Sequence, residues 1–174
     1  MRDLKVSTGI VRNHAEIVAL AERYRDLFED HPATTSERSR AGGSFDPFRD
    51  SEYEDDDRYH TLQGARMPDD LRRAVLDGIV PARTDITELY VQINRYDPGD
   101  YVLPHRDRLQ QGLYVLTTSN VDSLVVQDAS GRPVRLPDRA GNYITHDPAA
   151  WHWVDPVVDT LRYTIVTIPA LVYR

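Results

Sequence analysis

The residues of this chain that could carry chemistry begin with a histidine and an aspartate two positions apart, His105 and Asp107. They lie in the stretch Tyr101-Val-Leu-Pro-His105-Arg-Asp107, whose composition is typical of an extended segment. Residues i and i+2 of a strand point to the same face, so both side chains could reach one point. A neutral imidazole and a carboxylate are half of an iron site of the two-histidine, one-carboxylate type. Taken alone, the pair is a weak indication of a metal site.

A second histidine segment lies further along the chain, with His152 placed 45 residues after Asp107 and Arg162 ten residues after His152. In this order and spacing, the stretches around these residues resemble the non-haem iron(II), 2-oxoglutarate-dependent oxygenase family, in particular its prolyl-4-hydroxylase-like branch. The resemblance covers about residues 87–169. The stretches that carry it are Tyr96-Asp-Pro-Gly99-Asp-Tyr101-Val-Leu-Pro-His105-Arg-Asp107, Gly141-Asn-Tyr-Ile-Thr-His-Asp147, Ala150-Trp-His152-Trp-Val-Asp-Pro-Val157 and Leu161-Arg162-Tyr-Thr164-Ile165.

The resemblance implies a double-stranded β-helix fold, that is, a jelly-roll, cupin-like core. It also implies iron(II) as the metal, 2-oxoglutarate as cosubstrate and dioxygen as oxidant. His105, Asp107 and His152 match the catalytic positions that hold iron in that family, and Arg162 matches the position that binds the far carboxylate of 2-oxoglutarate. Such a ligand set occupies one face of an octahedral ion and leaves three positions open for the 2-oxo acid and dioxygen.

Charge balance supports the expected role of Arg162. Iron(II) with Asp107 keeps one positive charge, and the dianionic cosubstrate would leave one negative charge, which a guanidinium cancels with a planar fork suited to a carboxylate. Thr164, two residues on, shares the face of Arg162, so its hydroxyl could donate to the same group. Tyr96 and Tyr114 are further candidates for hydrogen bonds to the cosubstrate.

Two further points concern the ligands. Iron oxygenases that halogenate usually lack the carboxylate, so Asp107 favours hydroxylation, desaturation or oxidative ring closure and leaves these three open. His146 is the rival of His152 as distal ligand, and the Val-x-Pro-Val context and the spacing to Arg162 favour His152. His14 and His31 are expected to be solvated.

Length and composition limit the remaining options. A chain of 174 residues can bury one sizeable core, and the lack of cysteine excludes disulfides, iron–sulfur clusters and cysteine nucleophiles. With 28 acidic against 21 basic residues and a net charge of −7, the chain offers no domain-wide basic surface to nucleic acid. No apolar stretch is typical of a signal peptide or a membrane span, so we expect a cytoplasmic protein without membrane contact.

Two helices are predicted in the N-terminal half, and both should cover a sheet. The first runs from about Ala15 to Phe28, where apolar residues recur at helical spacing, with Asn13 and Glu16 as a capping box. The second runs from Pro68 to Asp77, with acidic residues in its first turn and Gly78 as its end.

Eight short β segments at about ten-residue intervals follow, a pattern typical of a sandwich or barrel. Residues 1–174 are thus expected to form one domain, mainly β with N-terminal helices. Residues 1–86 would form a helical scaffold with a substrate lid, and residues 87–169 a core that carries the metal site. The predicted strands are residues 88–95, 101–105, 113–117, 123–127, 133–136, 142–145, 151–154 and 160–168.

Residues 31–60 show no periodicity, and an irregular stretch of this length is either a functional lid or a disordered loop. Its acidic run would suit a small cationic substrate such as an amino sugar or an amine-bearing natural product. Equally, these carboxylates could serve only to keep the protein in solution. The expected substrate contacts are Asp55, Asp57 and His60 in this stretch, with a lesser share from Arg106 and Arg108 at the first metal ligands.

We therefore expect an oxygenase, monomeric or weakly dimeric, that hydroxylates or oxidatively cyclises a small natural product and releases succinate and CO2. One alternative is a peptidyl or prolyl hydroxylase, and another is a cupin-like protein that binds a ligand through a metal without oxidising it. Arg162 argues against the latter, which needs no cation ten residues past its last ligand. Repair of alkylated nucleic acid is disfavoured, because that branch carries a second arginine and an asparagine after the ligands, and only Arg174 follows Arg162 here.

Overall fold

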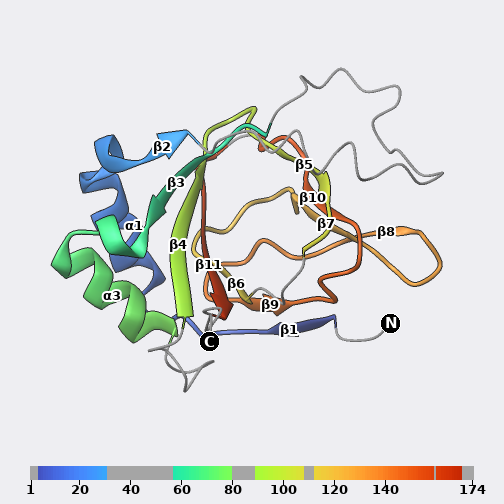
Figure 1. Cartoon of the computed structure of the whole chain (residues 1–174), viewed down its shortest axis with the longest axis horizontal. Coiled ribbons are helices and arrows are strands. Elements are labelled where there is room, and N and C mark those ends of the chain that lie inside the picture. The colour runs from blue at the N-terminus through green and yellow to red at the C-terminus, as the bar shows by residue number, and fades with distance from the viewer. Residues whose placement is uncertain (1–3, 31–56, 80–88, 108–111, 159, 170–174) are drawn as a thin grey trace, which may run out of the picture.

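The structure, a computed structural model, describes residues 4–30, 57–79, 89–107, 112–158 and 160–169. The fold is mainly β, with two antiparallel sheets and, among the described residues, two α-helices (Figure 1). Some of the expectations lie outside the described residues, namely Asp55, Arg108, His31 and most of the irregular stretch at 31–60.

The larger sheet has the strand order β1-β9-β6-β11-β4-β3-β2 and is antiparallel throughout. Its long strands β4 and β11 pair over their full length, with Arg162 opposite Tyr96 and Thr164 opposite Asn94. The strands are β1 (Lys5–Ser7), β2 (Glu29–Asp30), β3 (His60–Gln63), β4 (Leu89–Tyr96), β6 (Gly112–Val115), β9 (Tyr143–Thr145) and β11 (Arg162–Pro169).

The smaller sheet has the order β5-β10-β7-β8, with β5 (Val102–His105), β7 (Leu124–Gln127), β8 (Pro133–Arg135) and β10 (His152–Val154). Side chains from both sheets form one apolar cluster, which includes Tyr96 and Val115 from the larger sheet and Val126 and Val154 from the smaller. The inner faces of the two sheets therefore pack against each other, and the space between them is where a site can be enclosed.

The eight strands from β4 to β11 match the eight predicted segments, with bounds that differ by at most two residues. They divide evenly between the sheets, with β4, β6, β9 and β11 in the larger and β5, β7, β8 and β10 in the smaller. Strands β1, β2 and β3 were not predicted, and they extend the larger sheet at its two edges.

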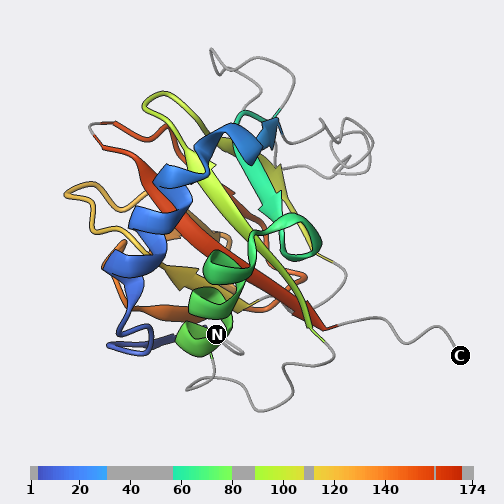
Figure 2. The same cartoon turned by 90° about the vertical axis from the view of Figure 1, so that its left-hand side faces the viewer.

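Helices α1 (His14–Arg23) and α3 (Asp69–Ile79) cover the outer face of the larger sheet, as Figure 2 shows. Two short 3-10 turns accompany them, η1 (Arg25–Leu27) and η3 (Gly64–Arg66). Ile17 of α1 and Leu71 of α3 pack on Ile93, Tyr163 and Ile165 of the sheet. Within the described residues, neither helix is long and apolar enough to cross a membrane.

Three details of the helix predictions are wrong. The first helix was expected to reach Phe28, but α1 ends at Arg23 and the 3-10 turn η1 follows it. The side chain of Asn13 does not cap α1, because its amide donates to the carbonyl of Ala74 at 2.9 Å and so ties the start of α1 to α3. Gly78 does not end α3, which continues to Ile79. The missing side chain allows the close approach of α1, since a Cβ on Gly78 would lie 2.7 Å from Oδ1 of Asn13.

Candidate metal centre and cosubstrate pocket

The end of β5 and the start of β10 bring the three expected metal ligands together. His105 lies directly opposite His152 across the two strands, and Asp107 follows His105 by two residues. Nε2 of His152 is 3.2 Å from Oδ2 of Asp107, and Nε2 of His105 is 3.8 Å from Oδ1 of the same carboxylate. One ligand atom from each residue lies within 4.8 Å of the others, which is a spacing that one metal ion could bridge.

Backbone carbonyls orient both imidazoles. Nδ1 of His105 lies 2.8 Å from the carbonyl oxygen of Leu103, and Nδ1 of His152 lies 3.0 Å from that of Ala150. A carbonyl oxygen can only accept, so each Nδ1 carries the proton and donates it. In the neutral ring Nε2 then presents a lone pair, and both lone pairs are turned toward the carboxylate of Asp107.

The ionisation states of these groups favour a bound cation. Burial, together with the neighbouring His105, lowers the pKa of His152 to about 4. Burial also opposes ionisation of Asp107, but the electrostatic influence of the surrounding imidazoles outweighs it and lowers the pKa of the carboxyl. At neutral pH the imidazole of His152 is therefore neutral and Asp107 is a carboxylate, so both turn acceptor atoms toward the centre. A divalent transition metal fits this set of donors.

His146 lies beside this centre without joining it. Its ring is 4.3 Å from that of His152 between centroids, and its Nδ1 lies 3.0 Å from the carbonyl oxygen of Asp147. The group of converging ligand atoms contains His152 and not His146. The geometry thus favours His152 as distal ligand, as the spacing in the sequence indicates. Two other histidines, His14 and His31, were expected to be solvated. His14 is half-buried on α1, and His31 lies outside the described residues.

A cavity of about 280 Å³ connects the three ligands with Arg162. Alternate residues of β4 form one polar wall, where Nε2 of Gln92 donates to Oδ1 of Asn94 at 2.8 Å. Asn94 donates in turn to the hydroxyl of Tyr96 at 3.4 Å. Apolar side chains complete the lining, and they are Val102, Leu113, Leu124, Trp153, Val154 and Val166.

Arg162 is 1% exposed and forms a bidentate ion pair with Asp138. Its Nε donates to Oδ2 at 2.9 Å and its Nη2 donates to Oδ1 at 3.0 Å. Burial opposes the charge of the guanidinium, but Asp138 outweighs it and raises the pKa of Arg162. Nη1 has no hydrogen-bond partner among the described residues. Asp138 was not identified from the sequence, where it is one of several aspartates in turn-forming stretches.

Thr164 follows Arg162 on the same face of β11, between Arg162 and Val166, which both line the cavity. Its Oγ1 is buried and, within the described part of the chain, makes no hydrogen bond. Buried polar atoms are almost always satisfied in folded proteins, so unpartnered Oγ1 and Nη1 indicate a missing hydrogen-bonding group. The far carboxylate of a dicarboxylic 2-oxo acid would satisfy both atoms.

The two tyrosines proposed as contacts of the cosubstrate lie on opposite faces of the larger sheet. Tyr96 lines the cavity, and its ring centre is 4.9 Å from the guanidinium carbon of Arg162. Tyr114 packs beneath the helices against Tyr143, with 4.6 Å between ring centroids. The structure does not bring Tyr114 to the cavity, because successive strand residues alternate and its neighbour Leu113 takes the inward position.

Two of the expected substrate contacts, Asp57 and Arg106, lie at two different cavities. Asp57 lines the cavity described above, and its Oδ1 accepts a hydrogen bond from the amide of Leu103 at 2.8 Å. Arg106 lines a second cavity of about 220 Å³, and its guanidinium lies 4.6 Å above the ring of Trp151. His146 lines both cavities, so they adjoin each other at this side chain.

His60 has different neighbours from those expected. Its Nδ1 lies 2.8 Å from Oδ1 of Asp30, and its Nε2 lies 3.4 Å from Oδ2 of Asp97 and 3.9 Å from Oδ2 of Asp100. These contacts link β2 and β3 to the turn after β4. His60 does not line either cavity.

Comparison with known proteins identifies relatives by fold only. No family model and no curated protein matches the sequence. A prolyl-4-hydroxylase from Pseudomonas putida matches with 15% identity and a TM-score of 0.61, over 96% of this chain and 91% of that one. A Trichoplax adhaerens prolyl hydroxylase, in complex with a hypoxia inducible factor oxygen degradation domain peptide fragment, matches with 13% identity and a TM-score of 0.65, over 98% and 84%.

The epimerase SnoN, in complex with Fe3+, alpha ketoglutarate and nogalamycin RO, matches with 13% identity and a TM-score of 0.62, over 96% of this chain and 78% of that one. At these identities the matches show a common fold. The resemblance seen in the sequence is therefore confirmed at the level of the fold, over a larger share of the chain than the residues that first indicated it.

Proposed function

We propose that this protein is an iron(II)- and 2-oxoglutarate-dependent oxygenase. The observation that carries the proposal is the single cavity that connects a converging His105, Asp107 and His152 with the unpartnered Nη1 of Arg162. One part of this cavity suits a divalent cation, and another part suits a carboxylate. A dicarboxylic 2-oxo acid that chelates the metal at one end meets both requirements.

On this proposal the two facing sheets are the two halves of a jelly roll. The even division of β4 to β11 between the sheets supports this reading, and so does the common fold with the proteins named above. The jelly roll explains why residues distant in sequence meet at one site. His105 and His152 come from adjacent strands of the smaller sheet, whereas Arg162 comes from the larger sheet.

When bound, iron(II) and 2-oxoglutarate would supply the oxidation of a substrate C–H bond by dioxygen, with release of succinate and CO2. His105, Asp107 and His152 would hold the metal by one face and leave positions for the 2-oxo acid and dioxygen. Nη1 of Arg162 and the hydroxyl of Thr164 would hold the far carboxylate, which orients the cosubstrate. The apolar side chains of the cavity would exclude water from the reacting groups.

The substrate in this proposal is a small molecule. The second cavity adjoins the first at His146 and offers the indole of Trp151 beside the cation of Arg106. The match to SnoN, whose structure contains nogalamycin RO, supports a natural product. A cationic substrate is disfavoured, since Arg106 brings a positive charge to this cavity. Asp57 of the acidic run already accepts a hydrogen bond from the amide of Leu103.

A peptide is the second candidate substrate, and the match to the Trichoplax adhaerens enzyme with its bound peptide fragment favours it. The two candidates make different demands on the protein. A peptide needs an extended groove, whereas a small molecule needs only the adjoining cavity. Succinate release under air, measured with a proline-containing peptide and with a polycyclic natural product, would separate them.

The proposal itself is tested by anaerobic titration with iron(II) and then 2-oxoglutarate, followed by the metal-to-ligand charge-transfer absorption of the chelate. The wild-type protein should develop this band, whereas the variant His152→Ala should not. Arg162→Ala should need a much higher 2-oxoglutarate concentration, because it removes the cation from the far carboxylate. If the wild-type protein binds iron(II) but never develops the band, the proposal of an oxygenase is wrong. The alternative of a protein that binds a ligand through a metal without oxidising it would then remain.

A further inference from the structure

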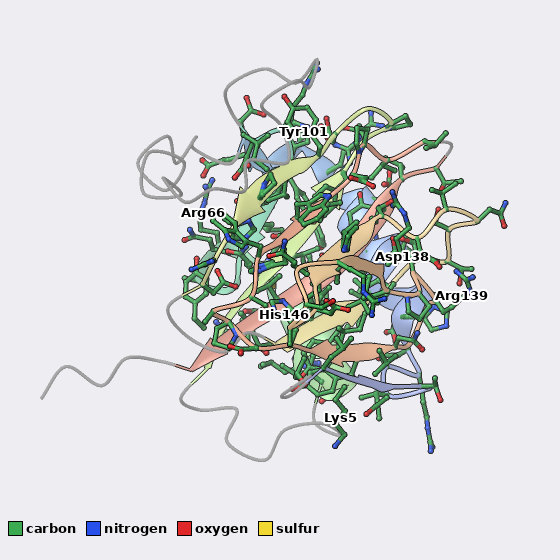
Figure 3. The ribbon with its side chains drawn as sticks, turned by 90° about the vertical axis from the view of Figure 1, so that its right-hand side faces the viewer. Lys5, Arg66, Tyr101, Asp138, Arg139 and His146 are labelled. Carbon is green, nitrogen blue, oxygen red and sulfur yellow. The ribbon has the colours of Figure 1, made fainter. Side chains whose placement is uncertain are left out.

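Asp138 is a fully buried carboxylate paired with Arg162, which lines the cosubstrate pocket, and the proposed reaction assigns it no role. It lies in the turn between β8 and β9, 24 residues before its partner Arg162 (Figure 3). Its two oxygens accept from Nε and Nη2 of that arginine at 2.9 and 3.0 Å. Burying two charges costs desolvation free energy, so a buried ion pair need not stabilise the fold. The pair between Asp138 and Arg162 therefore suggests a role other than stability.

The position of this carboxylate is fixed by the backbone around it. Oδ2 of Asp138 accepts a hydrogen bond from the amide of Ser123 at 3.1 Å. The amide of Asp138 donates to Oδ1 of Asp122 at 3.1 Å, and its carbonyl accepts from the amide of Ser119 at 3.1 Å. All three partners belong to the loop between β6 and β7, so the turn of Asp138 is tied to a second segment of chain.

The orientation of Arg162 follows from this anchor. A guanidinium has five N–H donors in a planar fork, and Asp138 takes one from Nε and one from Nη2, along one edge of the plane. Three donors remain, two of them on Nη1, which has no hydrogen-bond partner among the described residues. A long side chain that is free before binding loses rotamer entropy when a ligand fixes it. Asp138 removes this loss, since the guanidinium is already oriented.

We propose that Asp138 is a positioning residue for 2-oxoglutarate, which holds Arg162 by one edge so that Nη1 is presented to the far carboxylate. The inference rests on the proposed function. It also changes the charge balance expected from the sequence, because the charge of Arg162 is already matched within the protein. The pocket then holds the dianion by the directed hydrogen bonds of Nη1 and the Thr164 hydroxyl, and not by a surplus positive charge.

The test compares two 2-oxo acids in anaerobic titrations of the iron(II)-loaded protein, both followed by the charge-transfer band. 2-Oxoglutarate has the far carboxylate, whereas 2-oxobutyrate chelates the metal in the same way and lacks it. In Asp138→Ala the midpoint for 2-oxoglutarate should rise about tenfold or more, the effect of a lost charge-assisted hydrogen bond. The midpoint for 2-oxobutyrate should stay within about twofold, which also shows that the variant has folded and binds iron.

Three further variants complete the test. Asp138→Asn keeps the size of the side chain and one acceptor, so it should raise the 2-oxoglutarate midpoint less than alanine does. Asp70→Asn removes a carboxylate of an exposed ion pair with Arg23 on the helical side and should change neither midpoint. In the background of Arg162→Ala, adding Asp138→Ala should weaken 2-oxoglutarate binding no further, because Asp138 acts through the guanidinium.

Several results would overturn the inference. Unchanged binding of 2-oxoglutarate by Asp138→Ala would show that Asp138 does not position Arg162 for it. Tighter binding would show that the negative charge of Asp138 only repels the dianion. An equal loss for both acids would mean general damage to the site, and a further loss in the Arg162→Ala background would mean that Asp138 acts independently of the arginine. A wild-type protein with no band for either acid would instead contradict the proposed function itself.

Discussion

His105 and His152 face each other across neighbouring antiparallel strands, although 47 residues separate them in the sequence. Each ring is fixed by a backbone carbonyl at Nδ1, so each offers Nε2 to the same point. Replacing either histidine by alanine should weaken iron(II) binding about a hundredfold or more, because even the loss of a residue that only supports a ligand costs about 10–100-fold. Anaerobic calorimetry or the iron content after desalting measures this effect.

His146 provides the matched control for this experiment. Its ring lies almost as close to that of His152 as the ring of His105 does, with centroid distances of 4.3 and 4.1 Å, but it is not part of the converging group. His146→Gln should therefore retain iron(II) binding within a few-fold. A loss as large as that of His152→Ala would show that the distal ligand has been misassigned.

The substitution Thr164→Val should affect cosubstrate binding without lowering the stability of the fold. The hydroxyl is buried and makes no hydrogen bond in the described structure, so its replacement by a methyl group should leave the free energy of unfolding unchanged or slightly higher. Binding of 2-oxoglutarate should weaken by about 1 kcal/mol, the usual net value of one hydrogen bond. Thr164→Ser, which keeps the hydroxyl, should bind the cosubstrate like the wild type. If valine and serine variants bind it equally well, the hydroxyl makes no contact with the cosubstrate.

The hydroxyl of Tyr163 donates to Oε1 of Glu22 at 2.5 Å, on the helical side of the larger sheet. Burial and the neighbouring Glu22 raise the pKa of Tyr163 above its ordinary value. A raised pKa in the folded state gives stability that is complete below about pH 10 and is lost as the pH rises further, by up to about 1.4 kcal/mol per pH unit. Denaturant unfolding at several pH values follows this loss.

Tyr163→Phe should lower the free energy of unfolding at neutral pH by about 1 kcal/mol, because the hydrogen bond to Glu22 is lost. Above pH 10 the phenylalanine variant has no group to ionise at this position, so its stability should fall less steeply than that of the wild type. The difference between the two proteins should therefore shrink with rising pH. A difference that stays constant up to pH 11 would contradict the assignment of the raised pKa to this contact.

Local patterns were sufficient for the eight strands of the two facing sheets, because turn residues mark the strand ends and β-forming residues fill the segments between them. The four residues of β3 gave no such signal, since they become a strand only by pairing with β4, where Leu62 lies opposite Ile93. Tyr96 and Tyr114 were equal candidates in the sequence, and only Tyr96 lies on the inward face, because a shift of one residue along a strand changes the face.

The convergence of His105, Asp107 and His152 could be predicted because the i, i+2 rule and the family resemblance depend on few residues. Asp138 could not be, since its role depends on the fold that places its turn against Arg162. In sequence it does not differ from Asp128, another aspartate in a turn. Asp128 accepts hydrogen bonds from Ser130 and Arg132 and only closes its own hairpin. Local sequence identifies both as turn residues and does not distinguish a turn that closes on itself from one that holds a distant guanidinium.

Gly78 tests the close packing of α3 against the start of α1. Alanine in place of glycine normally stabilises a helix by about 1 kcal/mol. Here its Cβ would lie 2.7 Å from Oδ1 of Asn13 and 3.0 Å from Cδ1 of Ile17, so these side chains must shift, and overpacking of this kind costs about 1–3 kcal/mol. Gly78→Ala should therefore lower the free energy of unfolding by about 1 kcal/mol, measured by denaturant titration. Arg73→Ala, an exposed position of the same helix, should change it by less than about 0.5 kcal/mol. A stabilised Gly78→Ala variant would show that the side chains of Asn13 and Ile17 can move aside at no cost.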